Sequence, residues 1–340
     1  MFIYYVLLFL SALIFASQFF VTRQYQRRNG TGFLSSVKLS FFAYLTIAIF
    51  FFIKGCLTTG TLNFGFSWFT FFISLLIAFV SLSCVYMGIK VLAVGDMSIY
   101  SVVMMLGSLI LPSVVGVVFY KEELTLLKGI ALLLMFTAIV FSVSSIDKNK
   151  LTLKAILYYV GIFVMNGMIG VLFTIHQNQP ELTAGVLSTA EGFTVNNDVF
   201  MTWYGLATVL LSGVIYGVWV LLKKIKPQLF ESKLDQTNVD SENGETVVDS
   251  KESLVKALLI TIGLSAIYGL CNGVGDYFIA IATQPPPKAL GASVTFPIIN
   301  GGTIVFSTLS GIVFFKEKLT LSTVISLVIV IISTILFMFV

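Results

Sequence analysis

The sequence is poor in charged residues and in the side chains that build metal centres. Only 11% of its 340 residues are charged, where a soluble domain carries about 25%. It holds three cysteines and one histidine, His176, which we expect at the solvated membrane interface. One histidine cannot build a His-rich metal site, and an odd number of cysteines without metal spacing indicates neither a disulfide framework nor a cysteine-based metal site. We therefore expect no metal and no cofactor.

Several motifs that carry enzyme chemistry are also missing. The sequence has no Gly-x4-Gly-Lys-Ser/Thr phosphate loop, no His-Glu-x2-His metal motif and no Gly-x-Ser-x-Gly nucleophile turn. Its basic clusters are short and adjoin apolar segments, which does not suit a nucleic-acid surface. The sequence therefore predicts neither an enzyme nor a nucleic-acid-binding protein.

What the sequence has in excess is apolar length. Hydrophobic residues make up 57% of it, and the mean hydropathy is +1.00. A membrane-spanning helix needs about 20 apolar residues, and no alternating strand pattern competes with the apolar runs. The predicted fold class is an all-α integral membrane protein with ten transmembrane helices, the first of them uncleaved. The helices are expected at residues 2–21, 35–53, 67–89, 97–119, 126–145, 154–175, 198–222, 255–280, 291–315 and 320–340.

One stretch of the sequence occurs twice. Gly116–Leu126 and Gly311–Leu321 share eight identical residues of eleven at a constant offset of 195 positions (311 − 116). Each copy joins two apolar segments, so each half holds five helices. Because five is odd, the second half enters the membrane in the opposite sense, which predicts two inverted repeats. The predicted units are residues 1–150 and 151–340, the second with a polar loop at 176–197 and a disordered linker at 223–254.

The repeated turns are interpreted as helix ends and helix contacts. Thr125 and Thr320 can cap the start of the helix that follows each turn. Lys121 and Lys316 lie where a long side chain can reach the membrane interface. Glycines in the preceding helices allow close helix packing. The expected packing and turn residues are Gly107, Gly116, Glu122, Gly302, Gly311 and Glu317.

The positive charges are distributed unevenly. Sixteen of the twenty Lys and Arg residues lie in or beside the first, third, fifth, seventh and ninth connections. The positive-inside rule places these connections in the cytoplasm, and both termini then face outward.

The two turns and their surroundings resemble a known family. The spacing Tyr86-x3-Lys90, a Ser-containing helix and then Phe-Tyr-Lys-Glu-Glu-Leu-Thr before an apolar helix is similar to EamA-type members of the drug/metabolite transporter superfamily. Lys121 and Lys316 stand where that family usually has Gly, and Glu122 and Glu317 match its acidic position. The resemblance implies ten helices as five plus five and secondary transport of small metabolites. It also implies termini in the cytoplasm, the opposite of the charge-based orientation.

Polar side chains at membrane depth are costly and therefore mark candidate sites. Asn272 and Asp276 lie four residues apart, so they share a helix face. Asp276 can serve substrate binding or proton coupling, or it can lie in water near the helix end. The amide candidates can equally join helices, and the methionines can be packing residues. The candidate substrate-binding residues are Tyr100, Met104, Met105, Asn272, Asp276, Asn300, Gln18 and Asn166.

These features together predict a secondary transporter. It would move a small organic metabolite across the bacterial plasma membrane by alternating access, driven by a proton gradient or by exchange. Its partners would be the substrate, protons and the lipid bilayer. Two alternatives stand beside it: a membrane-embedded enzyme that modifies lipids, and a receptor or scaffold that acts through its long loops.

Overall fold

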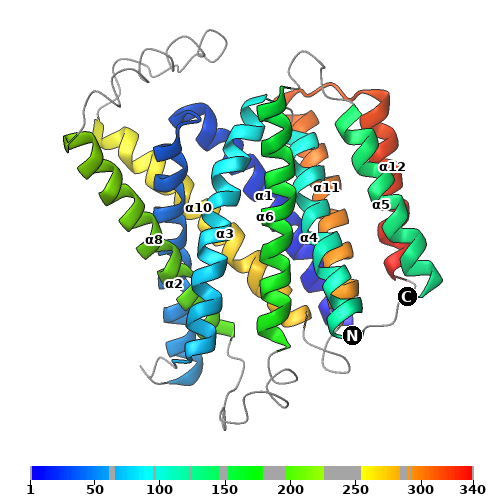
Figure 1. Ribbon diagram of the computed structural model, residues 1–340, viewed down its shortest axis with the longest axis horizontal. Coiled ribbons are helices and arrows are strands. Elements are labelled where there is room, and N and C mark those ends of the chain that lie inside the picture. The colour runs from blue at the N-terminus through cyan, green and yellow to red at the C-terminus, as the bar shows by residue number, and fades with distance from the viewer. Residues whose placement is uncertain are drawn as a thin grey trace.

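The computed structural model describes residues 2–60, 66–94, 97–121, 125–144, 152–178, 197–225, 254–283, 290 and 292–338. These ranges form ten α-helices and no strand, which confirms the predicted all-α class (Figure 1). The helices are α1 (Phe2–Asn29), α2 (Phe33–Thr59), α3 (Trp68–Val94), α4 (Met97–Phe119), α5 (Leu126–Ser144), α6 (Leu153–Gln177), α8 (Asn197–Ile225), α10 (Leu254–Ala282), α11 (Ala292–Phe315) and α12 (Leu321–Met338).

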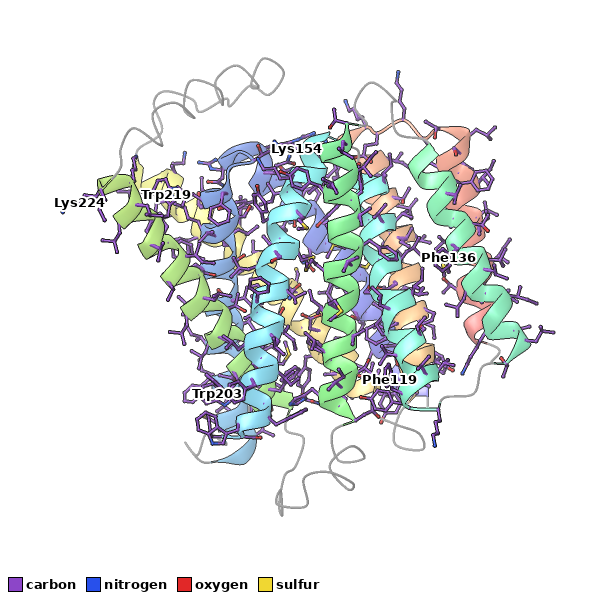
Figure 2. All side chains as sticks on the ribbon, in the orientation of Figure 1. Phe119, Phe136, Lys154, Trp203, Trp219 and Lys224 are labelled. Carbon is purple, nitrogen blue, oxygen red and sulfur yellow. The ribbon has the colours of Figure 1, made fainter. Side chains whose placement is uncertain are left out.

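Eight of these helices are long and apolar enough to cross a membrane. The apolar stretches of α5 and α12 are shorter, Leu126–Ala138 and Leu321–Leu336. Large apolar side chains also cover the outer surface of the bundle. Phe119 is 71% exposed and Phe136 is 52% exposed (Figure 2). An exposed apolar surface of this kind suits lipid as the surrounding solvent, so the fold is that of a multi-pass helical membrane protein.

The first helix is longer than the apolar pattern predicts. We expected an end near residue 21, but α1 continues to Asn29. The reason is that its basic residues find partners on neighbouring helices. The Arg23 guanidinium donates to the carbonyl of Leu92 on α3, and the Arg27 guanidinium lies 4.7 Å from the ring centre of Phe315 on α11. These contacts let the helix extend beyond its apolar segment.

The repeated turns have the predicted caps. The Thr125 hydroxyl accepts a hydrogen bond from the Lys128 N–H at 3.3 Å, and the Thr320 hydroxyl accepts one from the Thr323 N–H at 3.2 Å. Both turns also contain a lysine in the left-handed region, with φ of 53° at Lys121 and 55° at Lys316. Glycine is the residue that adopts this conformation without steric cost.

One acidic residue of the second turn reaches another helix. The Glu317 carboxylate accepts a hydrogen bond of 2.7 Å from the N–H of Met97, at the start of α4. It therefore satisfies one of the free N–H groups of that helix and links the end of α11 to α4. Glu122, the matching residue of the first turn, lies outside the described residues.

The helices pack in a regular set of pairs. α4 packs against α6 and α11, α1 against α10 and α11, α2 against α8 and α10, and α3 against α6 and α8. Two of the predicted packing glycines lie at such contacts. A side chain at Gly107 of α4 would meet the backbone of Phe163 on α6, and one at Gly302 of α11 would meet Ala12 on α1. Gly116 and Gly311 are buried near the ends of α4 and α11.

α5 and α12 form a pair at one edge of the bundle (Figure 1). Three serines of α12 hold this pair together through bonds to backbone carbonyls of α5. Ser322 donates to Phe141 at 2.7 Å. Ser326 and Ser333 continue the same row, with bonds of 2.8 and 2.7 Å. Hydroxyl-to-carbonyl bonds are a common way to join helices in lipid.

The predicted boundary at residues 150 and 151 lies between α5 and α6, in a stretch outside the described residues. The polar loop and the linker predicted at 176–197 and 223–254 also lie outside them, except at their ends. Those ends belong to helices: α6 continues to Gln177, and α8 runs from Asn197 to Ile225.

Candidate functional site

A cavity lies at the centre of the bundle. It is lined by α1, α3 and α4 from the first half of the sequence and by α6, α10 and α11 from the second, with Tyr44 of α2 and Tyr204 of α8. The centres of water molecules can occupy ≈ 60 Å³ of it. That is room for about five waters, given the roughly 10–15 Å³ that each needs. In this conformation the cavity is therefore too small for a metabolite.

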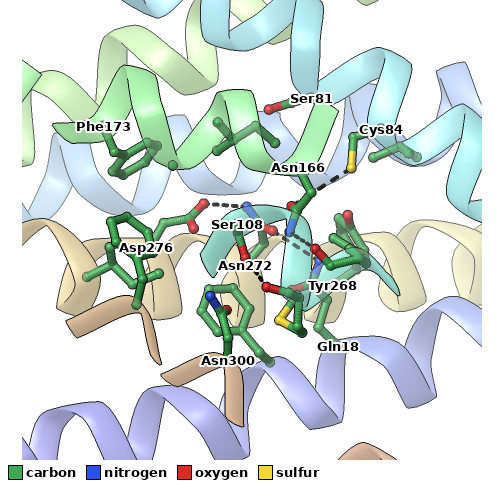
Figure 3. A pocket seen from close by; sticks show the side chains of 18 of the residues that line it. Gln18, Ser81, Cys84, Ser108, Asn166, Phe173, Tyr268, Asn272, Asp276 and Asn300 are labelled. Carbon is green, nitrogen blue, oxygen red and sulfur yellow. Dashed lines mark hydrogen bonds between the residues drawn. The ribbon is translucent and has the colours of Figure 1, made fainter. Parts of the chain in front are cut away.

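All eight candidate substrate-binding residues of the sequence analysis line this one cavity. Figure 3 labels Gln18, Asn166, Asn272, Asp276 and Asn300 among them. The eight residues come from five helices and are separated by up to 282 positions along the chain (300 − 18). Each of them can thus contact a molecule in the cavity, although the role predicted for them stays a prediction. The residues are Gln18 of α1, Tyr100, Met104 and Met105 of α4, Asn166 of α6, Asn272 and Asp276 of α10, and Asn300 of α11.

A chain of hydrogen bonds crosses one side of the cavity. The Gln18 amide N–H donates to Asn272 Oδ1 at 3.0 Å, and the Asn272 amide N–H donates to Asp276 Oδ2 at 2.8 Å (Figure 3). Asn272 and Asp276 therefore do share a helix face, as their spacing predicts. All three side chains are buried, so Asp276 lies inside the protein and not in water at a helix end.

Asn166 combines the two roles left open by the sequence. Its amide N–H donates to the carbonyl of Met104 on α4 at 2.8 Å, and its Oδ1 lies 3.9 Å from the thiol of Cys84 on α3. The residue thus joins α6 to two other helices while it also lines the cavity. Its polar atoms already have protein partners, which favours a positioning role.

Asn300 differs from the other amides. It is only 3% exposed, and its Nδ2 has no hydrogen-bond partner among the described residues. A buried amide donor without a partner costs about 1–3 kcal/mol. The helix-to-helix bond that we considered for Asn300 is therefore not made by its N–H groups within the described ranges. The donor is thus unpartnered within the described ranges, and the residue that carries it lines the cavity.

A cluster of hydroxyl groups also belongs to the cavity, and sequence reasoning missed it. The hydroxyls of Tyr44 and Tyr204 are 2.8 Å apart, and Ser81 Oγ lies 2.6 Å from the Tyr204 hydroxyl. The two rings meet edge to face with centres 5.0 Å apart. A tyrosine in an apolar helix gives no signal of its own, because its ring suits lipid and its hydroxyl needs a partner on another helix.

A second polar cluster joins three helices outside the cavity lining. Lys54 Nζ of α2 lies 2.6 Å from the Asp198 carboxylate of α8 and 2.8 Å from the Tyr277 hydroxyl of α10. The Lys54 side chain is 34% exposed and that of Asp198 is 10% exposed. This ion pair joins the end of α2 to the start of α8. Nothing in the local sequence of either residue indicates the other.

The lone histidine lies in a different setting from the expected one. We expected His176 at the solvated membrane interface, but it is buried. Its ring stacks on Phe200 with centres 3.8 Å apart, and its Nε2 lies 3.2 Å from the Thr70 hydroxyl. The prediction was wrong because Phe200 of α8 stacks on the ring, and the neighbouring Gln177 amide donates to Asn197 Oδ1 at the start of α8.

Comparisons with known proteins add information on the fold. No family model and no curated protein matches the sequence. Among the solved structures that match, one named "Crystal structure of protein" covers 98% of this chain and 96% of that chain, with 12% identity and a TM-score of 0.56. At this identity the likeness concerns the fold alone. Fold and site together thus define a multi-pass helical membrane protein with a polar cavity between its helices.

Proposed function

We propose that this protein is a secondary transporter that moves a small organic metabolite by alternating access. The observation that carries the proposal is the composition of the central cavity. Four helices from each half of the chain line it, and its described lining residues include amides, hydroxyls and one carboxyl group among apolar side chains. Transporters built from repeats place their substrate between the repeats near mid-membrane.

The packing of the helices supports an inverted-repeat arrangement. Pairing the halves in chain order matches α1 with α6, α2 with α8, α3 with α10, α4 with α11 and α5 with α12. Each helix can then be replaced by its counterpart in the other half. The packed pairs α4–α6, α1–α10 and α3–α8 become α11–α1, α6–α3 and α10–α2, and these three pairs also pack together. The pairs α2–α8, α4–α11 and α5–α12 are their own counterparts. Two such units have two related ways to pack, one open to each side.

The sequence adds a second, independent line of support. The repeated turns Gly116–Leu126 and Gly311–Leu321 resemble those of EamA-type drug/metabolite transporters. On this basis we propose a bacterial plasma membrane location, with a proton gradient or solute exchange as the driving force. The small volume of the cavity fits a closed intermediate, in which the helices must separate before a substrate enters.

Uptake into proteoliposomes tests the function. We expect at least one solute from a metabolite library to accumulate in vesicles that contain the protein, with or without a pH gradient, and none in protein-free vesicles. A chain that folds, by far-UV circular dichroism and gel filtration, yet moves no solute would count strongly against transport. If uptake is driven by a pH gradient, Asp276→Asn tests whether that carboxyl group couples protons to it.

Two further variants separate the alternatives. Deleting residues 230–250 leaves transport intact if the helices do the work, whereas a scaffold that acts through its loop loses its partner. Single cysteines at positions 30 and 190, in a background without Cys56, Cys84 and Cys271, report orientation through labelling of intact cells. The charge distribution predicts that only position 190 is labelled from outside. Labelling of position 30 alone would establish the opposite orientation.

A further inference from the structure

The charged groups of the cavity are unbalanced. Among the described residues that line it, Asp276 is the one acidic side chain, and none is Lys, Arg or His. The other titratable groups around the cavity are the hydroxyls of tyrosines, such as Tyr44, Tyr204 and Tyr268, and the thiol of Cys84. Hydroxyl and thiol groups of these types carry no charge near neutral pH. Within the described ranges, the lining therefore offers a ligand one acidic group and no basic one.

The Asp276 carboxylate has capacity left for a ligand. A carboxylate can accept about four hydrogen bonds, and Asp276 accepts one from Asn272, at 2.8 Å. Asn272 is itself fixed by the bond from Gln18, so Asp276 is held in place while its other lone pairs are available. A buried carboxylate is costly in a membrane unless a cation accompanies it. An ammonium group in the cavity would supply that cation.

The surrounding rings are suited to the same group. Seven aromatic side chains line the cavity, among them Phe15, Phe173 and Phe296. The faces of aromatic rings attract ammonium groups, most strongly where water is excluded. This chain contains such a contact outside the cavity lining, since Lys54 Nζ lies 4.4 Å from the ring centre of Tyr277. An aromatic or aliphatic body on the ligand would pack on the remaining rings.

Asn300 specifies a second group on the ligand. Its N–H donor has no hydrogen-bond partner among the described residues, and Asn300 lines the same cavity as Asp276 (Figure 3). A donor of this kind matches a carbonyl or hydroxyl oxygen. A carboxylate on the ligand would match it less well, because none of the described lining residues provides a cation to balance a second negative charge.

From these four features we infer that the cavity binds a monocationic amine that also carries an uncharged hydrogen-bond acceptor. Its ammonium group would bind Asp276 among the aromatic rings, and its acceptor would bind the Asn300 amide. Amino alcohols and amino-acid amides have this chemistry, whereas zwitterionic amino acids and organic anions do not. The inference rests on the proposed transport function, because uptake is one of the two quantities that test it. It adds to that function the charge type of the ligand.

A matched series of three solutes tests it: phenylalaninamide, phenylalanine and N-acetylphenylalaninamide share one side chain and differ in charge. Uptake into proteoliposomes and thermal stabilisation of the detergent-solubilised protein are measured for each at the same pH. We expect phenylalaninamide to be taken up and bound at least tenfold better than the other two. In the Asp276→Asn protein, phenylalaninamide should be taken up and bound less than twofold better than N-acetylphenylalaninamide. In the Asn300→Leu protein, uptake and binding of phenylalaninamide should be severalfold weaker.

The control is Asp198→Asn, which removes a carboxyl group outside the cavity and should keep the order of the three solutes. A preference for phenylalanine or for the neutral compound overturns the inference, as does an amide preference that survives in a folded Asp276→Asn protein. If no solute is transported but the amide alone stabilises the protein, the transport proposal fails and the ligand class holds. If none of the three stabilises the protein or is transported, the ligand class is wrong.

Discussion

A methyl group at Gly107 should separate two helices that now touch through their backbones. An alanine Cβ at this position would overlap the carbonyl oxygen of Phe163 on α6 and lie 2.8 Å from its carbonyl carbon. Ordinary contacts of a Cβ begin near 3.4 Å, so the carbonyl carbon alone requires α4 and α6 to move apart by about 0.6 Å (3.4 − 2.8), and the closer oxygen requires more. A gap of this size already removes about a quarter of the dispersion energy of each contact along the interface.

The expected magnitude follows from two opposing effects. Overpacking costs about 1–3 kcal/mol, and we expect the upper part of that range because a backbone carbonyl cannot rotate away as a side chain can. Alanine returns up to about 1 kcal/mol through its higher helix propensity. Gly107→Ala should therefore lower the free energy of unfolding by about 1–2 kcal/mol.

Gly263→Ala provides the matched control. Gly263 lies within α10, and a Cβ there meets nothing within 4 Å. This variant should gain up to about 1 kcal/mol from helix propensity alone. Unfolding by SDS in mixed micelles, followed by far-UV circular dichroism and extrapolated linearly, measures both. Equal stability of the two variants would refute the close backbone contact between α4 and α6.

Three further predictions concern the turns and the ion pair. Lys316→Gly should stabilise the protein by about 1 kcal/mol because it removes a left-handed non-glycine residue. Lys318→Gly loses the same charge without that gain, and equal stability of the two variants would contradict the prediction. Glu317→Ala should cost about 1 kcal/mol through loss of the bond to the start of α4, and Glu317→Gln, which keeps an acceptor, should cost less in the same assay. A double-mutant cycle with Lys54→Met and Asp198→Asn should give a coupling of about 1 kcal/mol, as expected for a partly exposed pair; a coupling indistinguishable from zero would mean that the two charges do not interact.

The repeated turns contain one feature that the sequence predicts, the threonine caps, and one that it does not, the left-handed lysines. Thr125 and Thr320 cap the helices that follow them, as the sequence predicts, because a cap depends on neighbours three residues away. The left-handed backbone at Lys121 and Lys316 was not predicted.

Sequence alone determined the ten helices and the shared face of Asn272 and Asp276. Both follow from short-range rules: an apolar run of about 20 residues satisfies its backbone only as a helix in lipid, and residues four apart lie on one side of it. The end of α1 was misjudged because the partner of Arg23 is on another helix.

Tertiary structure alone decided which polar groups meet. The hydroxyls of Tyr44 and Tyr204 are 160 positions apart in sequence, and Lys54 and Asp198 are 144 apart. Periodicity tells which face of a helix is polar, but it does not tell which helix that face will meet, because in lipid all apolar faces are alike. The candidate residues were chosen one by one as costly groups at membrane depth, and only the packing of the helices gathered them around a single cavity.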